Sequence, residues 1–237
     1  MKVVILAGGK GTRFDNETIL QPKPMIKIFD KPIIEHIITL FVRQGFKDFL
    51  IAGGYLCEHI VNYFSLEKIN EIQYKNTVNG INIQLIDTDV ESTTLERIIK
   101  TIPFIAEDKF ILTYGDGLCD VDMRNVINLH ENSSCFITLT AVNPPGRWGV
   151  LSFDKDSSII EFKEKQTKDW INGGFMIVDK EFLKYSFSSK EFESEALPLL
   201  SEMKHVNAFK HTGNWQCMDT RKDREEIEKY DLFNLKG

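Results

Sequence analysis

The stretch from Lys2 to Met25 constrains the fold of this chain more than any other. It begins with the apolar run Val3-Val4-Ile5-Leu6, which is too short for a helix and rich in β-branched residues, so it predicts a buried strand. Glycines then follow at positions 8, 9 and 11. Because glycine accepts positive φ angles and a close backbone approach, successive N–H groups can point into one concavity, where phosphate oxygens would fit.

Two cations and two prolines extend this pattern. Arg13 and Lys23 add positive charge beside the glycines. Pro22 and Pro24 hold the backbone on both sides of Lys23 extended, so the lysine is presented from a stiff segment. Glycines after a first strand are common in α/β folds and do not by themselves identify a phosphate site. The whole stretch, however, predicts a cradle for a triphosphate.

A dinucleotide site is an alternative interpretation of the same glycines. The segment from Gly9 to Phe14 begins like the fingerprint of such sites, but Phe14 stands where the third glycine should be. The second predicted strand, Phe49-Leu50-Ile51-Ala52, runs into Gly53-Gly54-Tyr55, and no acidic residue closes it. The sequence therefore disfavours an enzyme that transfers hydride.

Composition limits the class of partner. The chain has 237 residues, of which 42% are hydrophobic, so it can bury a full core. A formal net charge of −6 argues against nucleic acid and membrane surfaces, which normally require a basic face. The cysteines at 57, 119, 135 and 217 have no paired spacing, so we expect reduced thiols. We also expect a cytoplasmic protein, because neither a signal-peptide pattern nor a membrane-length apolar run is present.

Strands and helices alternate along the first half of the chain. Apolar residues recur at helical spacing from Pro32 to near Gly45, and the strand at 49–52 follows at once. The next predicted elements are a helix around Ile60, an alternating strand at Ile81–Asp87, a helix from about Thr93 to Thr101 and a buried strand at Phe110–Thr113. This order predicts an α/β fold with a mixed, mainly parallel sheet that helices cover on both faces. We expect a single domain with a small β insertion around 143–178, which contains a hairpin at 150–162.

Several motifs together resemble one enzyme family. LAGGKGTRF at 6–14 and PKPMIKI at 22–28 are similar to the signature of the sugar-1-phosphate nucleotidylyltransferases, which have a Rossmann-like fold. Glu17-Thr18 resembles the glucose-1-phosphate cytidylyltransferase branch of this family. So do TYGDG at 113–117, NPPGRWG at 143–149, INGGF at 171–175 and GNWQCMDT at 213–220. The resemblance covers nearly the whole chain and implies a nucleotide-binding half at about 1–120 and a sugar-phosphate-binding half at about 121–237.

The resemblance implies a reaction and its substrates. A nucleoside triphosphate, with CTP favoured, is joined to a sugar 1-phosphate, with glucose 1-phosphate favoured, and pyrophosphate is released. Arg13 and the glycine N–H groups would hold the β- and γ-phosphates, Lys23 the α-phosphate, and Lys165 the sugar phosphate. The implied nucleotide-binding residues are Leu6, Ala7, Gly8, Gly9, Gly11, Thr12 and Arg97. The implied sugar-phosphate-binding residues are Tyr114, Glu164, Asn172, Gly173 and Glu195.

Asp116 and Asp219 are the candidate carboxylates for Mg²⁺. Asp116 lies just past the predicted strand at 110–113, at the carboxyl end, where ligands of open α/β sheets gather. In an arbitrary protein it would be an ordinary turn aspartate between Gly115 and Gly117. Mg²⁺ needs one or two carboxylates besides waters and substrate phosphates. The resemblance supports Asp116 and adds Asp219, which is distant in sequence.

The substrates stay open at two points. The loop at Glu91–Leu95, where the resemblance implies that the base is read, is about two residues shorter than in the cytidylyltransferase branch, so another nucleotide or sugar phosphate is an alternative. Asp120 and Asp122 form the Asp-x-Asp pattern by which many glycosyltransferases hold a metal, although we expect it to cap the helix near Val126. A glycosyltransferase would release a nucleotide instead of pyrophosphate. A homo-oligomer is compatible with the sequence, which does not identify its interface.

Overall fold

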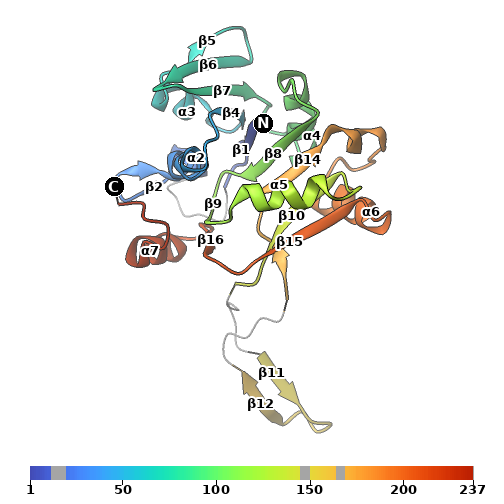
Figure 1. Cartoon of the computed structure of the whole chain (residues 1–237). Helices are drawn as coiled ribbons and strands as arrows, with labels where there is room; N and C mark the ends of the chain where they lie inside the picture. The colour runs from blue at the N-terminus through green and yellow to red at the C-terminus, as the bar shows by residue number, and fades with distance from the viewer. Residues whose placement is uncertain (12–19, 145–149, 164–168, 237) are drawn as a thin grey trace.

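A ten-stranded sheet forms the centre of the computed structural model, which describes residues 1–11, 20–144, 150–163 and 169–236 (Figure 1). The order of its strands is β13-β10-β14-β8-β1-β4-β7-β6-β5, and β15 also pairs with β10. The parallel centre consists of β1 (Val3–Leu6), β4 (Asp48–Gly53), β7 (Ile81–Asp87) and β8 (Lys109–Tyr114). The fold that the sequence predicts, with a mixed and mainly parallel sheet, is confirmed.

Antiparallel strands extend the sheet at both edges. One edge consists of β5 (Glu67–Lys68) and β6 (Gln73–Val78). The other edge consists of β10 (Ile137–Val142), β13 (Ile171–Asn172) and β14 (Met176–Asp179), with β15 (Val206–His211) parallel to β10. Three small antiparallel pairs lie outside this sheet: β2 (Lys27–Ile28) with β3 (Lys31–Pro32), β9 (Gly117–Cys119) with β16 (Trp215–Cys217), and β11 (Val150–Phe153) with β12 (Ile159–Lys163).

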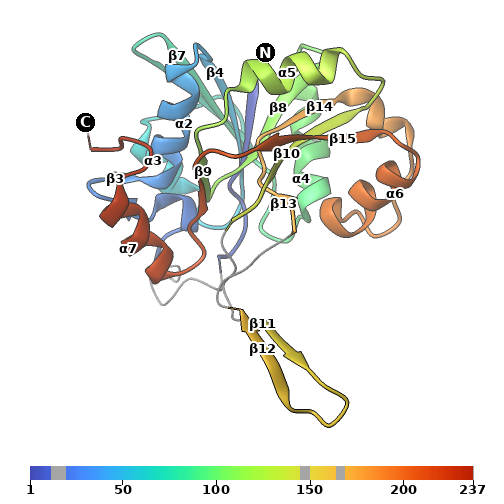
Figure 2. The ribbon, with the colours of Figure 1, turned by 60° about the horizontal axis from the view of Figure 1, so that its bottom comes forward.

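Helices cover both faces because successive side chains of a strand point to opposite sides. Val3 and Ile5 of β1 join one buried cluster, whereas Val4 joins the other. The first cluster includes residues of α2 (Ile33–Arg43), α3 (Glu58–Tyr63), α5 (Met123–Glu131) and α7 (Arg221–Tyr230). The second includes residues of α4 (Thr94–Thr101) and α6 (Leu197–Glu202), which lie across the sheet from α2 and α3 (Figure 2).

Short helical turns complete the described chain: the 3₁₀ turns η1 (Lys23–Met25), η2 (Ile102–Phe104) and η3 (Lys180–Lys184), and the π-helical turn η4 (Phe192–Ala196). None of the helices in the described ranges combines the length and apolar character that a membrane crossing requires. The predicted helices at 32–45 and 93–101 are confirmed as α2 and α4. The polar strand β6 was not predicted, because none of its side chains is buried and they show no clear alternation.

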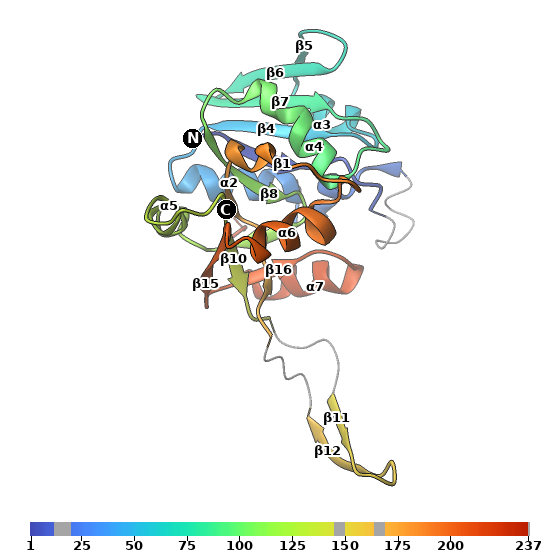
Figure 3. The same cartoon turned by 90° about the vertical axis from the view of Figure 1, so that its right-hand side faces the viewer.

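The β insertion is narrower than the sequence predicts. The hairpin of β11 and β12 is confirmed and projects away from the sheet (Figures 1 and 3). However, β14 lies between β10 and β8 in the main sheet, and β13 pairs with β10. Met176, Ile177 and Val178 are fully buried there, so this run belongs to the core and not to an insertion at 143–178.

The buried imidazole of His130 predicts acid sensitivity. His130 is 1% exposed on α5; its Nδ1 lies 2.9 Å from the Thr138 hydroxyl, and its Nε2 has no hydrogen-bond partner among the described residues. Burial, and secondarily the charge of Lys109, lowers its pKa below the ordinary 6.5. The folded state therefore takes up a proton less readily than the unfolded chain, and stability is lost as the pH falls from 6.5 toward that lower pKa.

We expect His130→Leu to reduce this loss, because the leucine fills the site without taking a proton. The urea midpoint should fall less between about pH 7.5 and about pH 5.5 in His130→Leu than in the wild type. The partly exposed His59→Leu serves as a control and should keep the wild-type pH dependence. An equal fall in His130→Leu and the wild type would show that other groups cause the acid sensitivity.

Candidate active site

A cavity of about 590 Å³ opens at the carboxyl ends of the central strands. Its wall is formed by the glycine-rich turn after β1 (residues 6–11), the loop that leads into α4 (residues 90–94) and the turn after β8 (residues 114–116). Lys23, Pro24, Arg97, Glu191 and Asp219 complete it. Parallel strands direct their carboxyl ends to one edge of the sheet, which is where α/β folds bind ligands.

The Lys23 ammonium lies between two carboxylates of this cavity. Its Nζ donates to Asp116 Oδ2 at 2.6 Å and to Asp219 Oδ1 at 2.7 Å. Lys23 is only 8% exposed. Burial alone would lower the pKa of Lys23, but the charge and hydrogen bonds of Asp116, with the hydrogen bond of Asp219, raise it above its ordinary value. Lys23 therefore keeps its positive charge at neutral pH.

Local pairing explains how these distant residues meet. Asp116 follows β8, and Asp219 lies between β16 and α7. Because β9 pairs with β16, Gly117 lies opposite Cys217, and the Met218 N–H donates to the Asp116 carbonyl at 2.8 Å. Pro22 precedes the turn η1 that presents Lys23, as the stiff segment in the sequence predicts. Both predicted metal carboxylates and Lys23 are thus brought together.

The donor set at this point suits a hard divalent cation. Carboxylate oxygens of Asp116 and Asp219 lie within 4.8 Å of one another and of the Cys217 sulfur. Mg²⁺ is typically held by one or two carboxylates together with substrate phosphates. The ammonium of Lys23 already lies between these oxygens, which indicates that the two carboxylates favour a positive charge there.

Gly8 and Gly9 have different tasks in the glycine-rich turn. A Cβ at Gly8 would lie 2.1 Å from Arg97 Nη1 and 2.8 Å from the Gly53 carbonyl oxygen, so the backbone there must lack a side chain. A Cβ at Gly9 would meet no atom of the described residues within 4 Å. Gly8 is therefore required for packing, whereas Gly9 leaves backbone open to the cavity.

Arg97 stabilises the cavity wall by donating hydrogen bonds to backbone carbonyls. Its Nη1 donates to the Gly53 carbonyl, the Thr88 hydroxyl and the Asp89 carbonyl, and its Nη2 donates to the Val90 carbonyl. Arg97 is 5% exposed, and burial lowers its pKa. The guanidinium that the resemblance assigned to the nucleotide is therefore committed to protein carbonyls, and its contact with a nucleotide stays a prediction.

The predicted sugar-phosphate residues Tyr114 and Asn172 lie in contact. The Tyr114 hydroxyl donates to Glu193 Oε1 at 2.8 Å, and Asn172 Nδ2 lies 3.4 Å from the same hydroxyl. Burial, followed by the charge of Glu193, raises the pKa of Tyr114, so the hydroxyl stays protonated. Gly173 adjoins Asn172, and its carbonyl accepts a hydrogen bond from the Trp215 indole at 2.8 Å. Tyr114 also lines the cavity.

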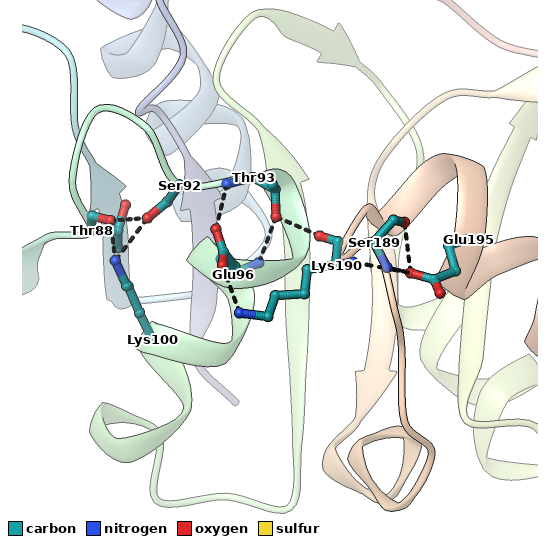
Figure 4. A network of polar contacts seen from close by, with 8 residues as sticks. All are labelled: Thr88, Ser92, Thr93, Glu96, Lys100, Ser189, Lys190 and Glu195. Atoms are coloured by element: carbon teal, nitrogen blue, oxygen red, sulfur yellow. Dashed lines mark hydrogen bonds and ion pairs between the residues drawn. The ribbon is translucent and has the colours of Figure 1, made fainter.

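The resemblance assigned Glu195 to the sugar phosphate, and this role stays a prediction. The Glu195 carboxylate accepts a hydrogen bond from the Ser188 N–H. It also accepts from the N–H groups of Ser189 and Lys190 and from the Ser189 hydroxyl (Figure 4). The Ser189 hydroxyl and these N–H groups lower the pKa of Glu195. Among the described residues, Glu191 lines the cavity and Glu195 does not. The carboxylate of Glu195 thus stabilises the loop at residues 188–190.

Other predicted residues lie outside the described ranges. These are Thr12, Arg13, Glu164 and Lys165, and also Glu17-Thr18 and most of the NPPGRWG motif. Their roles stay predictions. The structure adds Lys10, which lines the cavity and forms a 2.7 Å ion pair with Glu91. Its place between Gly9 and Gly11 was a signal that sequence reasoning missed.

The Asp-x-Asp pattern has a structural use in this fold. Asp122 caps α5 and accepts a hydrogen bond from the Arg124 N–H at 2.9 Å, which confirms the expected helix cap. Asp120 accepts from the Asn214 backbone at 2.9 Å and side chain at 2.8 Å, and lies 2.8 Å from His211 Nε2. Neither aspartate is among the described residues that line the cavity. This arrangement disfavours the glycosyltransferase alternative.

The fold and the site define a class of enzyme. A family model described as "Nucleotidyl transferase" matches residues 2–223. The chain belongs to this family of sugar-1-phosphate nucleotidylyltransferases, and it is a nucleotidyltransferase.

Its relatives differ in the nucleotide that their names specify. A glucose-1-phosphate cytidylyltransferase of Salmonella typhimurium is 37% identical over 96% of this chain and 95% of its own length. A probable glucose-1-phosphate cytidylyltransferase of Bacillus subtilis is 32% identical, with 97% and 95% covered. A D-glycero-alpha-D-manno-heptose 1-phosphate guanylyltransferase of Campylobacter jejuni is also 32% identical, with 82% and 86% covered. The structure of HddC from Yersinia pseudotuberculosis complexed with GMP-PN is 25% identical, with a TM-score of 0.71 over 96% of this chain and 98% of that one.

The contrast between the two glycines is testable. Gly8→Ala should lower the free energy of unfolding by about 1–3 kcal/mol, because the new methyl group overlaps Arg97 and the Gly53 carbonyl. Gly9→Ala is the matched control and should unfold close to the wild type, since its methyl group meets no described atom within 4 Å. Urea denaturation measures both values. Equal losses in the two variants would contradict the assigned packing role of Gly8.

Proposed function

We propose that this chain joins CTP to glucose 1-phosphate and releases pyrophosphate. The observation that carries the proposal is the Lys23 ammonium, bound by Asp116 and Asp219 at a cavity that the glycine-rich turn lines. The 37% identity to the Salmonella cytidylyltransferase over nearly both full lengths supports the choice of substrates. Guanylyltransferases among the relatives make another base with the same chemistry the alternative.

The reaction needs little covalent participation by the protein. A phosphate oxygen of the sugar 1-phosphate attacks the α-phosphorus of the nucleotide, and a new P–O bond forms. The bond between the α-phosphorus and the bridging oxygen breaks, and pyrophosphate leaves with its electron pair. The attacking phosphate is already ionised near neutral pH, so no general base is required. Positioning and neutralisation of charge therefore account for the catalysis.

The residues around the cavity divide these tasks. Lys23, which keeps its charge, is proposed for the α-phosphate, where charge develops during transfer. Open backbone at Gly9 supports binding of the leaving phosphates, for which Arg13 is also proposed. Tyr114 and Asn172 are proposed to orient the sugar phosphate, and Lys165 to hold its phosphate group.

We propose that Asp116 and Asp219 also hold Mg²⁺. Their close carboxylate oxygens and the cation already held between them support this assignment. Bound there, Mg²⁺ would supply positive charge that neutralises the phosphate oxygens. The contribution of the chain is to fix both carboxylates through the pairing of β9 with β16.

Base selection depends on the loop that leads into α4. Ser92, Thr93 and Thr94 line the cavity there. The hydroxyls of Ser92 and Thr93 donate to carbonyls of the chain, so we propose that the Thr94 hydroxyl and the N–H groups of the loop meet the base edge. Such groups discriminate because an unpaired buried polar group costs about 1–3 kcal/mol, roughly five- to a hundredfold in rate. UTP differs from CTP only at the pyrimidine edge, whereas purines differ in size.

Pyrophosphate release over a grid of nucleotides and sugar 1-phosphates tests the proposal. We expect the highest kcat/KM with CTP and glucose 1-phosphate, UTP as the next nucleotide, and poor turnover with GTP and ATP. A higher kcat/KM with GTP or ATP than with CTP would contradict the cytidine assignment and leave the family chemistry intact. Release of a nucleotide without pyrophosphate would contradict nucleotidyl transfer itself.

A further inference from the structure

We propose that Glu195 is a positioning residue for the nucleotide and not for the sugar phosphate. It acts through the loop Ser188–Lys190 and through Thr93, which lines the cavity. The inference rests on the proposed function, because it takes the loop at residues 90–94 as the wall that meets the nucleotide. Figure 4 shows the side chains that make this connection.

The first step is the attachment of Glu195 to its loop. Its carboxylate accepts from the backbone N–H groups of Ser188 at 2.5 Å, Ser189 at 2.8 Å and Lys190 at 3.0 Å, and from the Ser189 hydroxyl at 2.7 Å. Lys190 has a φ of 57°, a left-handed conformation that a side-chain-bearing residue rarely adopts. A carboxylate with these donors stabilises a backbone that would otherwise prefer another conformation.

The second step joins this loop to the start of α4. The Thr93 hydroxyl donates to the Lys190 carbonyl, and Lys190 Nζ forms a 3.0 Å ion pair with Glu96. Thr93 and Glu96 also form a capping box: Thr93 Oγ1 accepts from the Glu96 N–H at 3.2 Å, and Glu96 Oε2 accepts from the Thr93 N–H at 3.1 Å. An exposed ion pair contributes little alone. The hydrogen bond from the Thr93 hydroxyl to the Lys190 carbonyl, together with the capping box, is therefore the main connection between the loop and α4.

The third step is the fixation of the cavity wall from its other side. Lys100 Nζ donates to the Thr88 carbonyl at 2.9 Å and to the Ser92 hydroxyl at 2.8 Å, and the Ser92 hydroxyl in turn donates to Thr88 (Figure 4). The wall at residues 90–94 is thus held by hydrogen bonds to Lys100 and to the loop at residues 188–190. A wall that is ordered before binding spares the nucleotide the cost of ordering it.

A different carboxylate, that of Glu193, contacts the residues that we propose for the sugar phosphate. Glu193 accepts the hydrogen bond of the Tyr114 hydroxyl, and Tyr114 contacts Asn172. Both oxygens of Glu195, by contrast, accept donors from its own loop. The two glutamates lie on the same turn, η4, yet Glu193 contacts Tyr114, whereas Glu195 contacts the loop at residues 188–190. Loss of Glu195 should therefore affect one substrate selectively.

Calorimetric titration with CTP alone tests this selectivity, because no transfer occurs without a sugar phosphate. In Glu195→Ala the Kd for CTP should rise by about two- to thirtyfold, the range typical of residues that act through a network. The KM for glucose 1-phosphate should stay within about twofold of wild type, since its side of the cavity is unchanged. Glu181→Ala, which removes an exposed carboxylate paired with Lys184, is the matched control and should leave both values unchanged.

Thr93 provides an independent pair of variants. Thr93→Val, which removes the hydroxyl that is bonded to Lys190 and caps α4, should weaken CTP binding in the same way, and Thr93→Ser should restore it. This pair decides the question if circular dichroism shows that Glu195→Ala is unfolded. An unchanged Kd for CTP in folded Glu195→Ala, or a rise confined to the KM for glucose 1-phosphate, would overturn the proposal. Absence of pyrophosphate release in the wild type would instead contradict the proposed function, while nucleotide binding would still report on the loop.

Discussion

The contact of Lys23 with Asp116 and Asp219 is the interaction on which the rest of the site depends. It joins three parts of the chain that are far apart in sequence: the turn η1 near the start, the end of β8, and the segment between β16 and α7. A buried ammonium is stable only when carboxylates compensate its charge, and the carboxylates need a cation for the same reason. The parallel centre of the sheet and the pairing of β9 with β16 serve to bring these charges to one edge.

The strands and helices around the site that could be predicted from the sequence are those that depend on local patterns. The apolar run of β1, the helical spacing of α2 and the buried strand before Asp116 follow from short-range periodicity, and the structure confirms them. The tasks of Arg97 and Glu195 could not be derived in that way. Both side chains bind backbone carbonyls or N–H groups that only tertiary packing brings near, and the ligand contacts that the resemblance implied for them stay predictions. The extent of the β insertion was wrong for a related reason, since a buried run such as β14 joins whichever strands lie beside it.

The site therefore has a common part and a variable part. The neutralisation of charge that we propose for Lys23 and the two aspartates is a requirement of every nucleotidyl transfer, whatever the base or sugar. We propose that the loop at residues 90–94 selects the base, and its shape depends on Arg97, Lys100 and the loop at residues 188–190. Because loops tolerate change more readily than core strands, relatives that share this fold can differ in the nucleotide that their names specify.

The most direct measurement of the central claim is the rate of pyrophosphate release by Asp219→Asn at saturating CTP, glucose 1-phosphate and Mg²⁺. The substitution keeps the shape of the side chain and removes the charge that Asp219 offers to Lys23 and, as we propose, to Mg²⁺. With the fold verified by circular dichroism, kcat should fall by about a hundredfold or more, as expected when transition-state charge loses a stabilising group. A kcat near that of the wild type would contradict the account.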